Sequence, residues 1–183
     1  MLVSARPCLL FFFGVLGLAL TGCASTSTES RMLTDATVSI ERLAVMLDVP
    51  DTAMREGMVS VLRESLSADN VEVVVVETSR DPRPERIAQI GANADASAVL
   101  FAGTTSMLLG DETVTAQTRF GEKAAATQAF TINLTLYGVD AQRRIWTATT
   151  TSQKKGRGQR TEIGREVAQS AVQAMRDDGL LSP

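Results

Sequence analysis

The side chain best suited to covalent chemistry is the thiol of Cys23, which directly follows Leu20, Thr21 and Gly22. The chain of 183 residues has one other cysteine, Cys8, and no histidine. Without histidine there is no Ser-His-Asp or Cys-His nucleophile, no imidazole general base and no histidine-containing zinc site. The thiolate of Cys23 can still act as a nucleophile and form a thioether. The chemistry expected of Cys23 is therefore the covalent attachment of another group.

Other reaction classes also lack their residues. The sequence contains neither a GxxxxGK[ST] phosphate loop nor a GxGxxG turn. Its acidic residues are scattered, so two-carboxylate hydrolysis remains open without a pair to assign it to. The aromatic side chains beyond Cys23 are too few for a platform that stacks sugars or bases: Phe101, Phe120, Phe130, Tyr137 and Trp146. We therefore expect a protein that is not an enzyme and that holds neither a metal nor a cofactor.

The residues before Cys23 predict secretion. Cys8 to Leu20 is an unbroken run of apolar residues and glycine, and Arg6 is the only charged side chain in residues 1–22. A helix that spans a bilayer needs about 20 apolar residues, whereas the core of a secretory signal needs about 7–15. Residues 1–22 are thus predicted to be a cleaved signal peptide. The alternative is an unlipidated signal that happens to end at a cysteine.

The sequence Leu20-Thr21-Gly22-Cys23 resembles the lipobox of bacterial lipoproteins. In that family the cysteine thiol receives a diacylglycerol, the signal is cut before it, and the new amino terminus takes a fatty acid such as palmitate. Several acyl chains anchor a protein stably where one chain is marginal. Ala24 stands where an aspartate commonly marks retention in the inner membrane, so the resemblance implies the periplasmic face of the outer membrane.

A tether and one domain are predicted to follow the lipid. Ala24 to Ile40 begins rich in Ser and Thr and has no sustained apolar period, which is typical of a flexible segment. We therefore expect residues 23–40 to be the lipidated cysteine and its tether, and residues 41–183 to be the periplasmic domain.

A basic cluster is the other candidate for a functional surface. It consists of Lys154, Lys155, Arg157 and Arg160, next to Gly156 and Gly158, in a chain with net charge −3. Such a loop could contact anionic lipid headgroups, lipopolysaccharide phosphates or an acidic protein patch. The alternative is a solvated loop whose charge is partly balanced by Glu162 and Glu166.

Hydrophobic periodicity predicts the strands and helices that position these candidate residues. Glu41–Val49 is predicted to be a buried strand, and Pro50-Asp51-Thr52 to supply a stop and a capping residue for a helix with Met54 and Met58 in the core. The four valines of Val71–Glu77 predict a strand covered on both faces. A second helix is expected over Glu85–Ala92, and a strand from Ala98 to Leu109.

The second half of the chain predicts a hairpin and a last helix. Residues 110–128 lose their periodicity and could be an excursion of the hairpin, a mobile loop or an exposed edge. Ala129–Val139 alternates with a period of two, and 144–153 returns after a turn at Asp140. Trp146 is expected to pack in the fold, the alternative being an exposed anchor. With a helix over Glu162–Gly179, the order is β-α-β-α-β-β-β-α: one α+β domain with three helices on a mixed sheet.

Three segments together carry a wider resemblance: RLAVMLDV at 42–49, NADASAVLFAGTT at 93–105 and the hairpin FTINLTLYGVDAQRRIWTATTT at 130–151. The set is similar to a group of envelope lipoproteins. This group includes the periplasmic domain of the curli secretion channel, the activators of peptidoglycan synthases and the amino-terminal domain of the Tol propeller protein. The resemblance implies an α+β fold and a partner-binding role without catalysis.

The sequence therefore predicts an outer-membrane lipoprotein that acts as a non-enzymatic interaction or assembly module of the cell envelope. Its expected partners are membrane lipid through Cys23 and an envelope protein or further copies of itself, and not nucleic acid. The alternative is an accessory of secretion, or of lipid or polypeptide transport, with a ligand between sheet and helix.

Overall fold

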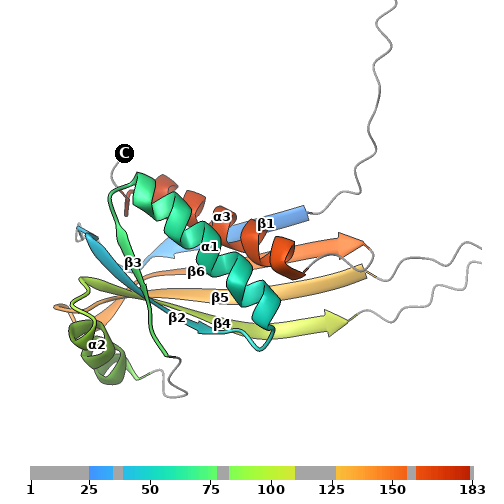
Figure 1. The fold of residues 1–183 in the computed structure, drawn as a ribbon. Helices are drawn as coiled ribbons and strands as arrows, with labels where there is room; N and C mark the ends of the chain where they lie inside the picture. Colours follow the sequence, from blue (N-terminus) through green and yellow to red (C-terminus); the bar gives the residue numbers. More distant parts are fainter. Residues whose placement is uncertain (1–24, 35–38, 78–82, 110–126, 156–159, 182–183) are drawn as a thin grey trace, which may run out of the picture.

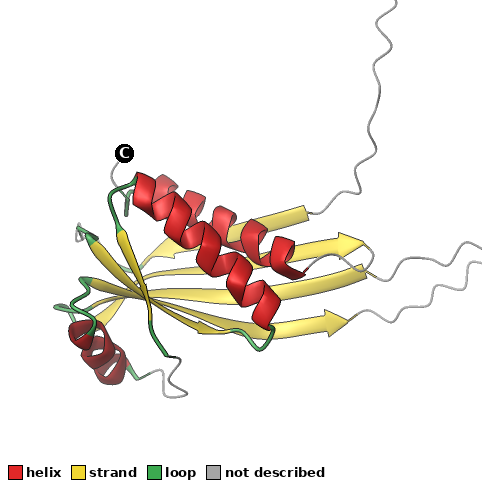
Figure 2. Cartoon of the chain, viewed as in Figure 1, coloured by secondary structure: helices red, strands yellow, loops and turns green. Residues whose placement is uncertain are grey.

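A computed structural model describes residues 25–34, 39–77, 83–109, 127–155 and 160–181. The described chain forms one six-stranded mixed sheet in the order β1-β6-β5-β4-β2-β3. The strands are β1 (Ser25–Met32), β2 (Arg42–Asp48), β3 (Glu72–Val75), β4 (Ala98–Leu109), β5 (Thr127–Gly138) and β6 (Arg143–Lys155). The helices α1 (Thr52–Ala68) and α3 (Arg160–Asp177) lie side by side across one face, and α2 (Pro84–Asn93) covers the other face at one end (Figures 1 and 2).

The α+β fold expected from the sequence is confirmed, including the order of its elements from β2 to α3. The alternating apolar residues of β5, namely Phe130, Ile132, Leu134 and Leu136, are all buried beneath α1 and α3. Met54 and Met58 of α1 are fully buried in the same core, as predicted. None of the helices in the described part of the chain is both long and apolar enough to cross a bilayer.

The expectation of a flexible tether over residues 23–40 is wrong for Ser25–Met32, which form strand β1. β1 pairs antiparallel with β6 along its whole length, from Ser25 opposite Gln153 to Met32 opposite Trp146. Its inward side chains are mostly hydroxyls: Thr28 bonds the buried Thr150 at 2.8 Å and Ser170 of α3 at 2.7 Å, and only Met32 at the end of the strand packs against the apolar core. A strand that docks through hydroxyl groups carries no apolar period, and this is why the sequence pattern did not indicate it.

The prediction that Val71–Glu77 is covered on both faces is also wrong. Its strand, β3, is the short outermost strand on the side of the sheet opposite to β1, and it pairs only with β2. Val73 and Val74 are half-buried, and Val75 is 39% exposed. A run of β-branched residues favours a strand, but the number of neighbours around it depends on its place in the sheet.

The helices α1 and α3 pack closely because each has a glycine at the crossing. A Cβ atom on Gly57 would lie 2.1 Å from the carbonyl oxygen of Thr161, and one on Gly164 would lie 2.0 Å from that of Met54. Both distances are far inside van der Waals contact, so the two backbones approach as only glycine permits. Gly57 and Gly164 therefore serve the packing of one helix on the other.

Trp146 lies in the core rather than on the surface, as predicted. Its side chain is fully buried, and its indole Nε1–H donates a hydrogen bond of 2.6 Å to the Asp178 carboxylate just after α3. This bond ties the end of α3 to β6.

Candidate functional site

The lipobox, Leu20 to Cys23, lies outside the described residues, so its acylation stays a prediction. Of the basic cluster, Arg157 lies outside them too, and Lys154 and Lys155 are described only as the last positions of β6. Arg160 is described, as the first residue of α3.

Arg160 has a partner within the chain. Its guanidinium donates a hydrogen bond to the carboxylate of Asp51, the residue that caps the amino terminus of α1. The other oxygen of the same carboxylate accepts the backbone N–H of Met54 at 2.9 Å. Burial alone would raise the pKa of Asp51, but these hydrogen bonds and the positive charge of Arg160 together lower it below its ordinary value. The ion pair thus links the amino-terminal end of α3 to that of α1.

Strand register shows which residues gather at the end of the sheet where β1 begins. Ser25 lies opposite Gln153, Thr127 opposite Lys155, and Leu109 opposite Gln128. The start of β1 and the end of β6 therefore lie at one edge of the molecule, together with the end of β4 and the start of β5 (Figure 1). The turn between β5 and β6 and the helix α2 lie at the opposite edge.

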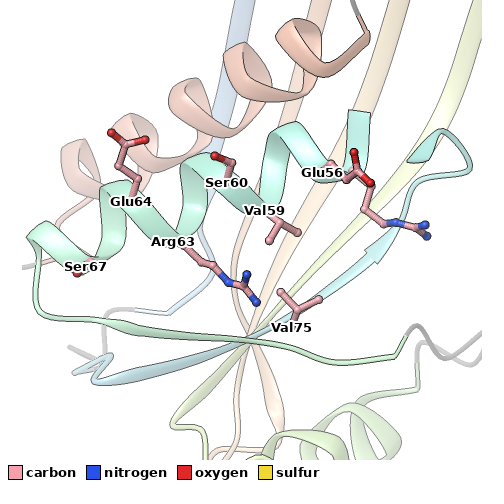
Figure 3. A pocket seen from close by; sticks show the side chains of 8 residues that line it. Glu56, Val59, Ser60, Arg63, Glu64, Ser67 and Val75 are labelled. Atoms are coloured by element: carbon pink, nitrogen blue, oxygen red, sulfur yellow. The ribbon is translucent and has the colours of Figure 1, made fainter. Parts of the chain in front are cut away.

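A second candidate surface is an open groove between α1 and β3, with a volume of about 860 Å³. Val59 and Arg63 of α1 and Val75 of β3 point toward one another across it, while Glu64 points away from β3 (Figure 3). The groove is lined by Arg55, Glu56, Val59, Ser60, Arg63, Glu64, Ser67 and Val75. The groove thus has an apolar centre of two valines and a rim with charges of both signs, which is the composition of a surface that contacts another molecule.

Two further hollows border the same strand. One lies toward α2 and is lined by Val74 and Val76 together with Arg86 and Ile90. The other lies near the end of β2, where Leu47 and Arg55 meet Val75 and Val76. Hollows thus flank β3 on both faces of the sheet.

The outer edge of β3 offers backbone groups as well. Glu72 N–H donates to Glu41 O at 2.9 Å and Val76 N–H donates to Val45 O at 3.0 Å, so the even-numbered residues face the neighbouring strand β2. In a parallel strand the intervening residues turn their N–H and C=O groups to the other side. Val73 and Val75 therefore direct theirs to the open edge.

Sequence reasoning did not find this groove. The exposed face of α1 carries Arg55, Glu56, Arg63 and Glu64, but nothing in the sequence sets β3 beside that face. Among the described residues, no group of three His, Cys, Asp or Glu side chains is arranged to hold a metal ion.

Comparisons with known proteins give a likeness of fold. No family model and no curated protein matches the sequence. The solved PelC dodecamer from Paraburkholderia phytofirmans is similar at a TM-score of 0.53 and 11% identity, over 80% of this chain and 94% of that one. A single-residue variant of that dodecamer gives a TM-score of 0.52 and 13% identity, over 82% and 99% of the two chains. Lipoprotein GNA1162 from Neisseria meningitidis has 14% identity over 74% and 98%, at a TM-score of 0.45. At such identities the likeness to PelC concerns the fold alone.

Proposed function

We propose that this protein is an outer-membrane lipoprotein, acylated at Cys23, whose domain serves the cell envelope as a non-enzymatic module that assembles with copies of itself. The observation that carries the proposal is the β3 edge, where an open strand, a 39% exposed valine and the α1 groove occur together. An unpaired edge strand is a ready template for another chain, and proteins usually cover or blunt such edges.

The composition of the groove favours a protein partner over a small ligand. Its apolar centre, Val59 and Val75, is small and open, and its rim carries Arg55 and Arg63 as well as Glu56 and Glu64. Protein interfaces combine an apolar centre with a polar rim in this way, whereas small-molecule sites enclose most of the ligand surface. Charges of both signs also suit a surface that meets a second copy of the same chain.

The fold likeness supports self-assembly in particular, since the solved PelC protein is a dodecamer. In an assembly whose contacts run head to tail, two different patches of each subunit meet, and closure gives a ring. The β3 edge would be one of the two patches.

The test is native mass spectrometry of the full chain extracted from bacterial membranes in detergent. We expect a subunit mass that has lost residues 1–22 and gained the lipid, together with a discrete oligomer. Val75→Asp introduces a charge into the groove and should shift the oligomer to monomers. Gln169→Asp, at an exposed position of α3, is the matched control and should leave the oligomer intact. A wild-type protein that is monomeric in detergent and after cross-linking in membranes would overturn self-assembly.

A further inference from the structure

We infer that the domain stands on the membrane with one defined end, the edge of the sheet where β1 begins, and that this end faces a surface of anionic lipid headgroups. The inference rests on the proposed acylation of Cys23. It goes beyond that proposal because an anchor at the end of a flexible tether would leave the orientation of the domain open.

The chain between the lipid and the fold is short. β1 begins at Ser25, so Ala24 alone separates it from Cys23. Two Cα–Cα steps reach at most about 7.6 Å. A flexible tether through residue 40 would instead have allowed up to about 60 Å. The start of β1 must therefore lie next to the headgroups that hold the acyl chains.

Strand β1 is an integral part of the sheet. All eight of its residues are paired with β6. Thr26 adds a hydrogen bond of 3.1 Å to the buried Ser152, and Thr28 bonds both Thr150 and Ser170. β1 is held by its pairing with β6 and by its bond to α3. If Ser25 lies at the membrane, the strand ends beside Ser25 therefore lie at the membrane as well.

Two lysines lie at the end of the sheet near the anchor. Gln153 lies opposite Ser25, and β6 then continues through Lys154 and Lys155. Basic residues near a membrane surface are attracted by anionic lipids. The opposite end carries charges of both signs: Asp140 and the exposed Arg143 and Arg144 in and after the β5–β6 turn, and Asp95 paired with Arg42. The feature that favours anionic headgroups at the anchor end is thus the pair of lysines with which β6 ends, beside Glu166 near Thr26.

The orientation leaves the α1–β3 groove on the flank of the domain. β3 is an outer strand of the sheet, so its open edge faces sideways when the strand ends face the bilayer. Copies anchored in the same membrane would then meet flank to flank.

The experiment uses the full acylated chain in vesicles of phosphatidylcholine mixed with phosphatidylglycerol. With Cys8 removed and Cys23 acylated, an introduced cysteine is the only free thiol. Gln153→Cys and Asp140→Cys are both exposed positions and are separated along β6 by about ten residues, or roughly 33 Å. Each variant is labelled with a fluorophore, and quenching by lipids that carry a nitroxide on the headgroup is measured.

We expect strong quenching at Gln153→Cys and little at Asp140→Cys. Equal quenching at the two positions, or stronger quenching at Asp140→Cys, would overturn the inference. A Gly/Ser insertion between Ala24 and Ser25 is the control and should reduce the quenching at Gln153→Cys in vesicles of pure phosphatidylcholine. In that insertion variant phosphatidylglycerol should restore the quenching; a lack of any response to it would overturn the anionic-headgroup part.

The mass of the same purified samples separates this inference from the proposed function. A protein without lipid on Cys23 refutes the acylation itself. An acylated protein with equal quenching at both positions refutes only the orientation.

Discussion

Asp51 and Asp69 stand on either side of α1, and each pairs with an arginine of α3. Arg160 bonds Asp51 before the helix, and Arg176 reaches Asp69 after it at 2.8 Å. Between these two pairs, Gly57 and Gly164 let the helix backbones touch. These two ion pairs and two glycines add to the shared apolar core of α1 and α3, and single substitutions should expose the contribution of each.

Stability should fall in acid as Asp51 takes up a proton. Because its pKa in the folded protein is lowered, the unfolded chain binds the proton first as the pH falls. The contribution of Asp51 is therefore complete above about pH 4, the ordinary aspartate range, and is lost as the pH drops through the lowered pKa. Urea unfolding at pH 7 and pH 3 should show a smaller pH dependence for Asp51→Asn than for the wild type. An unchanged dependence would contradict this role.

Gly164→Ala should destabilise the domain by about 1–3 kcal/mol or more, since its new methyl group meets the Met54 carbonyl. Thermal unfolding measures the effect. Gly103→Ala is the comparison, because a Cβ there meets only the ring of Phe101 at 3.2 Å, and a side chain can move. A Gly164→Ala protein as stable as the wild type would show that the helices can separate at no cost.

At the scale of elements, the strands and helices that bury apolar residues could be predicted from the sequence. β5 shows this best, because every second residue from Phe130 to Leu136 is apolar and all four are buried. β1 could not be predicted, because most of its inward contacts are made by Thr26 and Thr28, and a hydrophobic pattern does not detect hydroxyl pairs. Val73 and Val75 predicted a strand, but they gave no indication that this strand would be the outermost one of the sheet.

The docking of β1 should depend on the Thr28 hydroxyl. Thr28→Val keeps the shape but leaves the buried Thr150 and the Ser170 hydroxyl without this partner, at a cost of about 1–3 kcal/mol. Hydrogen exchange should accelerate in the β1 amides and remain slow in β5. Thr149→Val, on the exposed face of the sheet, removes only a bond to Asn133 and is the matched control. Equal exchange in both variants would argue against the hydroxyl contacts.

At the scale of the whole molecule, the sequence predicts attachment to the outer membrane through Cys23, a residue that lies outside the described part of the chain. The fold class and the order of elements from β2 onward followed from periodicity, since both depend on burial along one chain. The α1–β3 groove depends on which strands become neighbours, and Arg55 or Val59 gives no signal of that. The pairing of Arg160 with Asp51 likewise joins residues far apart in the sequence.

Replacing the Cys23 thiol should abolish the anchor without disturbing the domain. Cys23→Ser cannot form the thioether, so we expect a mass without diacylglycerol and with residues 1–22 retained. The thermal unfolding of the domain should stay close to that of the wild type, because the described fold begins at Ser25. A lipid-containing mass for Cys23→Ser would place the attachment elsewhere.

The short link to β1 also has a mechanical consequence. Any pull between the domain and its membrane enters through the first residue of a strand and acts along the strand axis. The eight residue pairs between β1 and β6 then bear the load together, in shear, instead of opening one after another like a zipper. An edge strand built from small hydroxyl side chains would thus serve as the element that resists traction.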